Sequence, residues 1–249
     1  MTEFWGEVIG TALLLTLGNG IVANQLLGKT KGNGTGWLLI TVGWGLSVAV
    51  AAYSVARISG AHLNPAVTIG VWYNGGMDLE QVPVYLAAQM LGAFIGAVLV
   101  WLTYYSHWSE TDDADLKLAV FSTGPAIRAP FWNLFCEVVG TAVLIFGILA
   151  IAANVDEMKS DGLPDFSTVF SSGINPLLVG LLVCVIGMGL GGPTGFAINP
   201  ARDLAPRIAH AILPIPGKGT SDWGYAWIPV VGPMLGGVLG AMLFQVLGS

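Results

Sequence analysis

The sequence is poor in charged residues. Of its 249 residues, 9 are Lys or Arg and 15 are Asp or Glu, so 10% are charged and 54% are hydrophobic. A soluble domain usually carries about 25% charged residues, and this deficit indicates a chain whose solvent is mostly lipid. The net charge of −6 and the lack of a basic run argue against nucleic acid as a partner.

Cysteine and histidine are also scarce, with two and three residues. Cys136 and Cys184 lie inside apolar stretches, so we expect buried free thiols rather than a disulfide or a metal pair. We expect no metal ion and no cofactor. An intramembrane enzyme would need a nucleophile with a base or a metal cluster, and the sequence has no such pattern, so we expect no enzymatic activity. The first 20 residues lack the basic region of a cleaved signal peptide.

Long apolar runs dominate what is present. A helix needs about 20 residues to cross a hydrocarbon core of about 30 Å. Tyr and Trp gather near the ends of the runs, as in the aromatic belts of membrane proteins. Six runs are long enough, and we place these spans at residues 4–28, 37–56, 81–105, 131–153, 174–191 and 224–247.

Two shorter apolar runs each follow an Asn-Pro-Ala turn. The segments are GAHLNPAVTIGVWYN at residues 60–74 and GFAINPARDLAPRIA at residues 195–209. Each run has only about ten residues, which span about 15 Å, or half a membrane. The sequence therefore predicts two re-entrant half-helices in addition to the six spans.

The two halves of the chain share one order of segments. Glu7 begins EVIGT near the start of the first span, and Glu137 begins EVVGT near the start of the fourth. Each half contains three full spans, an odd number, so the second half must enter the membrane inverted. We therefore expect one all-α channel domain over 1–249, made of inverted repeats 1–109 and 130–249 joined by a linker at 110–129. Residues 154–168 form a second polar loop.

The Asn-Pro-Ala turns predict capped helix starts. Asparagine is a preferred N-cap and proline is favoured at the first helical position. Buried helix N-termini carry partial positive charge, so two of them meeting at one point would repel a cation but accept water or a hydroxyl. The turn residues are Asn64, Pro65, Ala66, Asn199, Pro200 and Ala201. The extended segments before the turns would supply pore-lining carbonyls, from Gly60, Ala61, His62, Thr194 and Gly195.

With both turns, the paired Glu-x-x-Gly-Thr strings and the string NPARD, the whole chain resembles the major intrinsic protein family, the aquaporins and aquaglyceroporins. Within this family it is most similar to the bacterial glycerol facilitators. The resemblance implies a homotetramer with one pore in each subunit, in the plasma membrane. It also implies an outer constriction, or selectivity filter, at four positions found by their spacing to the turns: Trp44, Gly187, Phe196 and Arg202.

These filter residues predict passage of a polyol. Where water-selective members typically have histidine, this chain has Gly187, which leaves room. Trp44 and Phe196 would face a carbon backbone, while Arg202 offers planar donors to hydroxyl groups. Asp203 follows Arg202, as in glycerol-conducting members, and Arg207 lies at its i+4 position for a local ion pair.

The remaining polar residues allow alternatives. Glu7 and Glu137 could couple transport to protons, which would make the protein a proton-coupled small-solute transporter with inverted repeats. We favour a structural role in which they accept hydrogen bonds from the half-helix loops. His62 is interpreted as structural, with its carbonyl toward the pore. The expected solutes are glycerol, water, dihydroxyacetone, urea, hydrogen peroxide and undissociated lactic acid, with membrane lipid around the protein and ions and protons excluded.

Overall fold

The computed structural model describes residues 1–157 and 166–248. Within these residues, six helices are long and apolar enough to cross a membrane. Five of them are α1 (Thr2–Leu26), α2 (Trp37–Ser59), α4 (Val82–Thr103), α6 (Pro130–Glu157) and α10 (Ile228–Gly248). The remaining span joins α7 (Ser167–Val169), the π-helical turn η3 (Phe170–Ile174) and α8 (Asn175–Leu190). The predicted six-span membrane fold is confirmed.

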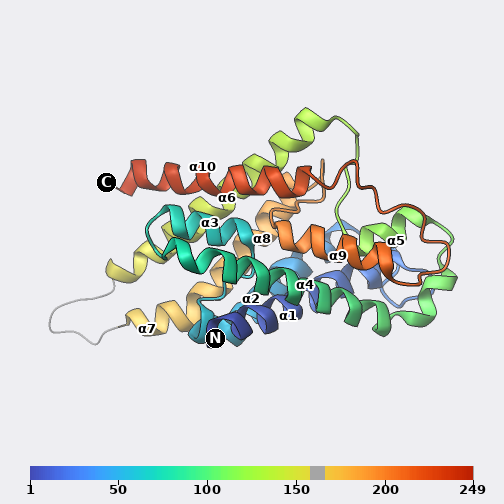
Figure 1. The fold of residues 1–249 in the computed structure, drawn as a ribbon, viewed down its shortest axis with the longest axis horizontal. Coiled ribbons are helices and arrows are strands. Elements are labelled where there is room, and N and C mark those ends of the chain that lie inside the picture. Colours follow the sequence, from blue (N-terminus) through green and yellow to red (C-terminus); the bar gives the residue numbers. More distant parts are fainter. Residues whose placement is uncertain (158–165, 249) are drawn as a thin grey trace.

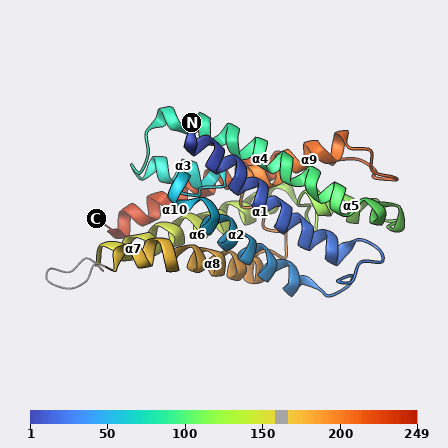
Figure 2. The ribbon, with the colours of Figure 1, turned by 90° about the horizontal axis from the view of Figure 1, so that it is seen from below.

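The two half-helices are α3 (Pro65–Tyr73) and α9 (Pro200–Ile212). Figures 1 and 2 show α3 toward the end of the bundle that carries both chain termini and α9 toward the opposite end. Their N-terminal ends therefore point toward each other from opposite sides. Helix α3 packs on α10 and α9 packs on α4, so each half-helix contacts a span of the other half of the chain.

The spans pack in equivalent pairs. Helix α1 contacts α4 as α6 contacts α10, and α2 packs on α8 across the two halves. Gly92 of α4 lies against the Val8 carbonyl of α1, and Gly236 of α10 lies against the Val138 carbonyl of α6. A Cβ atom at either glycine would collide with that carbonyl, so the backbones touch directly, as small residues allow in membranes. This repeated contact is a structural trace of the inverted repeat.

Several of the predicted boundaries need correction. The fifth span begins at Ser167 rather than residue 174, because the π-helical turn continues the helix before Pro176. The sixth begins at Ile228 rather than residue 224, since a run of turns occupies 223–227. The region between the halves is not all loop, because it holds the 3-10 helix η2 (Tyr105–Glu110) and α5 (Ala114–Phe121), which Asp113 caps.

Other short elements complete the chain. The 3-10 helix η1 (Leu79–Gln81) leads directly into α4. Of the predicted polar loop at 154–168, residues 154–157 continue α6 and residues 167–168 lie in α7, so these parts are helix rather than loop; residues 158–165 lie outside the described residues. Cys136 and Cys184 are free thiols, as predicted; Cys184 is buried and Cys136 is half-buried.

Candidate functional site

Both half-helices begin at a capping asparagine. The Asn64 Oδ1 accepts a hydrogen bond from the Ala66 N–H at 2.8 Å. The Asn199 Oδ1 accepts from the N–H groups of Ala201 at 3.0 Å and Arg202 at 3.2 Å. Pro65 and Pro200 are the first helical residues, where proline lacks only an N–H that would have no partner in the helix. These caps let a helix start at membrane depth, where water is scarce.

The two caps are also joined to each other's loops. The Asn64 Nδ2 donates to the Ile198 carbonyl at 2.8 Å, and the Asn199 Nδ2 donates to the Leu63 carbonyl at 2.9 Å. A side-chain amide has two N–H donors, so each asparagine keeps a second donor for a solute. The cross-links fix both helix N-termini at one place between the two halves.

Two buried glutamates bind the loops that precede the half-helices. The Glu7 carboxylate accepts from the N–H groups of His62 at 3.0 Å and Leu63 at 2.7 Å. The Glu137 carboxylate accepts from Ala197 at 3.0 Å and Ile198 at 2.9 Å. Each carboxylate therefore satisfies two donors of a buried, non-helical segment, which would be costly if left unpaired.

The backbone of both loops is strained in the same pattern. Positive φ angles occur at Ala61 (54°) and Leu63 (54°) in one loop, and at Phe196 (39°) and Ile198 (42°) in the other. Such angles are uncommon for residues other than glycine and cost free energy that the surroundings must supply. Here the bonds from Glu7 and Glu137 to N–H groups of the two loops help to hold this conformation.

A cavity of about 470 Å³ runs beside the two caps. Among the sequence-predicted residues, its walls include Trp44, Gly60, Ala61, His62, Asn64, Phe196, Asn199 and Arg202. Gly187, Thr194 and Gly195 are not among the described residues that line it, and neither are the turn residues Pro65, Ala66, Pro200 and Ala201, which are buried behind the caps. Arg202 is the only Arg, Lys, Asp or Glu among the described lining residues.

The predicted filter residues contact one another in two pairs, Arg202 with Trp44 and Gly187 with Phe196. The guanidinium carbon of Arg202 lies 4.2 Å from the centre of the Trp44 ring, as a cation–π contact. Gly187 lies behind Phe196, because a Cβ atom added to it would be 2.9 Å from the Phe196 Cζ. The space that glycine leaves is therefore occupied by the phenylalanine ring.

A residue that the sequence analysis did not single out supports Phe196. The Trp37 ring packs edge-on against the Phe196 ring, with centroids 5.7 Å apart. The Trp37 Nε1 donates to the Gly187 carbonyl at 3.1 Å, which ties the start of α2 to α8. Trp37 precedes Trp44 by seven residues, two helical turns, and this spacing on one face was the available signal.

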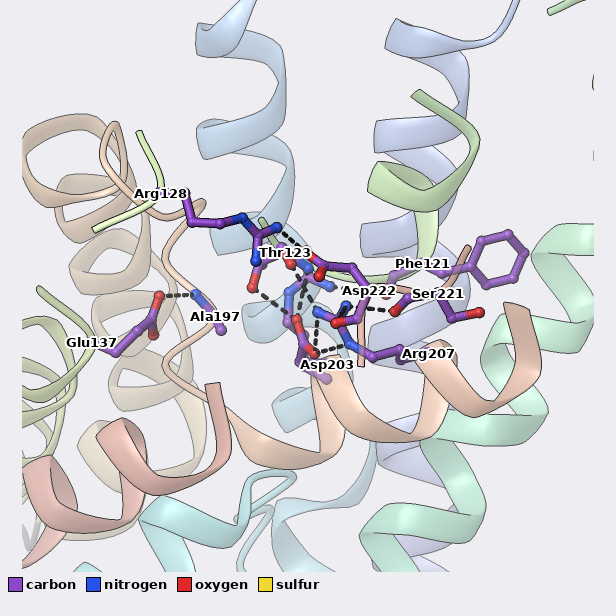
Figure 3. A network of polar contacts seen from close by, with 10 residues as sticks. Phe121, Thr123, Arg128, Glu137, Ala197, Asp203, Arg207, Ser221 and Asp222 are labelled. Carbon is purple, nitrogen blue, oxygen red and sulfur yellow. Dashed lines mark hydrogen bonds and ion pairs between the residues drawn. The ribbon is translucent and has the colours of Figure 1, made fainter. Parts of the chain in front are cut away.

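Arg202 is held by a polar contact from outside α9, and Asp203 by an ion pair within it. The Arg202 Nη1 donates to the carbonyl of Phe121 at 3.3 Å. Asp203 pairs with Arg207 over 2.8 Å, and both side chains are fully buried. Figure 3 shows Phe121, Asp203 and Arg207 together with the Glu137 bond to Ala197. Phe121 was missed because a backbone carbonyl has no signature in the sequence.

The His62 ring makes a polar contact through its Nδ1 and a packing contact with another ring. The Nδ1 lies 3.2 Å from the Thr68 Oγ1, and the ring packs against Tyr85 with centroids 4.8 Å apart. Thr68 is also bound by the Gln89 Nε2 at 2.9 Å, which in turn binds Glu7 at 2.8 Å. Gln89 was not predicted, yet it connects the first loop to α4.

Comparisons with known proteins point to one family. The family model for Major intrinsic protein matches residues 1–244. A probable glycerol uptake facilitator protein of Thermotoga maritima is 56% identical over 247 residues, covering 99% of this chain and 100% of that protein. The glycerol uptake facilitator protein of Bacillus subtilis is 56% identical over 245 residues, covering 98% and 84%. The aquaglyceroporin of Plasmodium falciparum has a similar structure, with a TM-score of 0.79 and 34% identity over 98% of this chain and 95% of that one.

Proposed function

Because the chain belongs to the major intrinsic protein family, we propose that it is a passive channel that carries glycerol across the plasma membrane. The single observation that carries the proposal is the meeting of two capped helix N-termini beside one continuous cavity. The positive ends of the helices disfavour cations there, while the spare amide donors of Asn64 and Asn199 can bind a hydroxyl oxygen. Two relatives with 56% identity are named as glycerol uptake facilitators, which supports glycerol as the main solute.

The chemistry of the cavity walls fits a small polyol. One side carries Trp44 and Phe196, on which a carbon skeleton can lie, and Arg202 presents planar donors to hydroxyl groups. Backbone carbonyls near Gly60, Ala61 and His62 would accept the hydroxyl hydrogens as the solute moves on. Thr194 and Gly195 would supply the corresponding carbonyls from the other half of the chain, although neither is among the described residues that line the cavity.

The same pore would admit other small neutral molecules. Water fits wherever glycerol fits, and we include dihydroxyacetone, urea, hydrogen peroxide and undissociated lactic acid because each is uncharged and of similar or smaller width. Ions and protons would be excluded by Arg202 and by the paired helix N-termini in series. We further propose a homotetramer with one pore per subunit, and a division into repeats 1–109 and 130–249 with a linker at 110–129.

A proton-coupled transporter is the alternative, and the contacts of the carboxylates do not favour it. A coupling group would be expected at the solute site near the midplane. Among the described residues that line the cavity there is no Asp or Glu. Glu7 and Glu137 instead hold the backbone donors of the two loops.

Purified protein in liposomes tests the proposal. Stopped-flow light scattering after an osmotic step with glycerol, urea or a larger polyol should show rapid water and glycerol passage relative to protein-free liposomes. A counterflow assay with labelled glycerol separates a pore from a carrier. Saturation at millimolar glycerol or accelerated exchange would show a carrier and overturn the proposal.

A further inference from the structure

Two polar side chains line the cavity near the start of the fifth span. Ser171 and Asn175 lie four residues apart, in the π-helical turn η3 and at the first position of α8. Apart from Asn175, the described lining residues of α2, α6 and α8 are hydrophobic residues or proline. The pair is therefore a polar patch in a wall that is otherwise apolar.

The side-chain amide of Asn175 makes no hydrogen bond to the described residues, and its Oδ1 is shielded from solvent. An amide offers two donors and two acceptor lone pairs, and such a group costs free energy when it is buried without a partner. A half-turn of the amide exchanges its oxygen and nitrogen, so either atom can turn toward the cavity. The Ser171 hydroxyl donates to the Thr168 carbonyl at 3.3 Å, which leaves its oxygen free to accept.

The backbone fixes where Asn175 lies. Its N–H donates to the Phe170 carbonyl, five residues back, and Pro176 after it has no N–H to donate. The Tyr53 hydroxyl donates to the Gly173 carbonyl at 2.7 Å, which ties the π-helical turn to α2. Single π-helical turns inside helices are frequent at functional sites.

The pair lies far from the filter. Gly187, which lies behind Phe196, follows Asn175 by twelve residues on α8, and twelve helical residues span about 18 Å. Figures 1 and 2 show α7, just before this pair, toward the end of the bundle that carries both chain termini. A solute therefore meets the filter and this pair in turn, not together.

We propose that Asn175 and Ser171 form a second solute-binding site in the cavity, which selects polyols by their hydroxyl groups. A hydroxyl that leaves water for an apolar wall loses its hydrogen bonds. The Asn175 amide can donate to that hydroxyl or accept from it, and the Ser171 oxygen can accept from it. The inference rests on the proposed function and extends it to the end of the pore away from the filter.

The site should favour solutes with more hydroxyl groups. The compound 1,2-propanediol has the carbon skeleton of glycerol with one hydroxyl fewer, so it can turn its methyl group toward this wall. Leucine has about the size of asparagine without its polar atoms. In Asn175→Leu, glycerol permeability should therefore fall more than propanediol permeability, whereas a side chain that only narrowed the pore would slow both solutes alike.

The test measures both permeabilities in proteoliposomes, after subtraction of the passage through protein-free liposomes. Because about one net hydrogen bond is lost, we expect the ratio of glycerol to propanediol permeability to fall roughly twofold to tenfold in Asn175→Leu. The fall should be smaller in Ser171→Ala, which loses only the hydroxyl. The ratio does not depend on how much channel is inserted.

Asn154→Leu is the matched control. Asn154 is exposed on α6, is not among the described residues that line the cavity, and donates within its own helix to the Ala150 carbonyl at 2.8 Å. An unchanged or raised ratio in Asn175→Leu, or an equal fall in Asn154→Leu, overturns the second site. If Asn175→Leu fails to insert, Asn175→Ala is measured by the same ratio and judged in the same way. Wild-type protein that passes no glycerol above protein-free liposomes would contradict the proposed function instead.

Discussion

The guanidinium carbon of Arg202 lies 4.2 Å from the centre of the Trp44 ring, and both residues line the same cavity. No carbon skeleton fits in that gap. A cation–π contact in a desolvated place stabilises by about 2 kcal/mol, which a solute hydroxyl that binds the guanidinium can offset. A solute that lay on this face of Trp44 would therefore have to take the place of the guanidinium.

Replacing Arg202 with valine should widen the filter. The variant loses the cation and the donors, so urea and larger polyols should enter more readily, and proton or cation leakage should rise from near zero. The helix N-termini at Asn64 and Asn199 remain, so leakage should stay modest. Swelling assays with a solute panel and a pH-sensitive dye inside the vesicles measure both effects. Wild-type selectivity in a well-inserted variant would mean that Arg202 does not line the pore.

A histidine at position 187 needs room that Phe196 now occupies. In Gly187→His alone, the new Cβ would meet the Phe196 Cζ at 2.9 Å and displace the ring. The double variant Gly187→His with Phe196→Ala should instead narrow the pore, lowering glycerol flux about tenfold or more while water flux changes little. Phe196→Ala alone is the control, and it should retain glycerol flux. Equal loss of water and glycerol in the double variant would contradict this arrangement.

Trp37 should affect solute choice although it is not one of the predicted filter positions. In Trp37→Leu both the edge contact with Phe196 and the bond to the Gly187 carbonyl are lost, whereas Trp37→Phe loses only the bond. We expect the permeability to urea to rise relative to the permeability to glycerol in the leucine variant, and to rise less in the phenylalanine variant. The urea to glycerol permeability ratio is the measurement. Identical ratios in both variants and the wild type would show that Phe196 needs no support.

Glu137→Gln should destabilise the protein. An amide offers one oxygen, so it can accept from Ala197 or Ile198 but turns a donor toward the other N–H. Leaving a buried donor unsatisfied costs about 1–3 kcal/mol, and we expect a lower unfolding temperature in detergent at one fixed heating rate. Glu110→Gln is the control, because Glu110 pairs with Lys29 on the surface, where such pairs contribute little. Equal unfolding temperatures for both variants would contradict the role of Glu137.

The fold could be predicted because the membrane restricts it so strongly. Six long apolar runs, two short ones and a repeated Asn-Pro string leave few ways to satisfy the backbone in lipid. The boundaries were harder where hydropathy and helix geometry disagree. The chain near Trp223 is apolar enough for a span but folds as turns, and the segment before Asn175 looked like loop but continues the helix through a π turn.

The filter was predicted at the level of residue types but not of contacts. The family resemblance, applied through the spacing to Asn64 and Asn199, gave Trp44, Gly187, Phe196 and Arg202. The structure brings three of them to one cavity, and Gly187 is not among its described lining residues. The spacing could not select Phe121, because this residue contributes a main-chain carbonyl whose place depends on how the linker folds over α9. Nor could it indicate that Arg202 rests on Trp44, since rotamers depend on packing.

The alternating positive φ angles before the half-helices have a consequence for how this channel can change. Their carbonyls belong to the main chain, so no codon change at Ala61 or Leu63 can delete an oxygen; it can only make the conformation harder to hold. Mutations can therefore change the side chains of the filter and the caps, but they cannot remove the main-chain carbonyl oxygens of the two loops. A test of one of these carbonyls calls for chemical synthesis rather than mutagenesis, with an ester in place of one amide, which weakens the carbonyl as a hydrogen-bond acceptor and removes the N–H of the next residue.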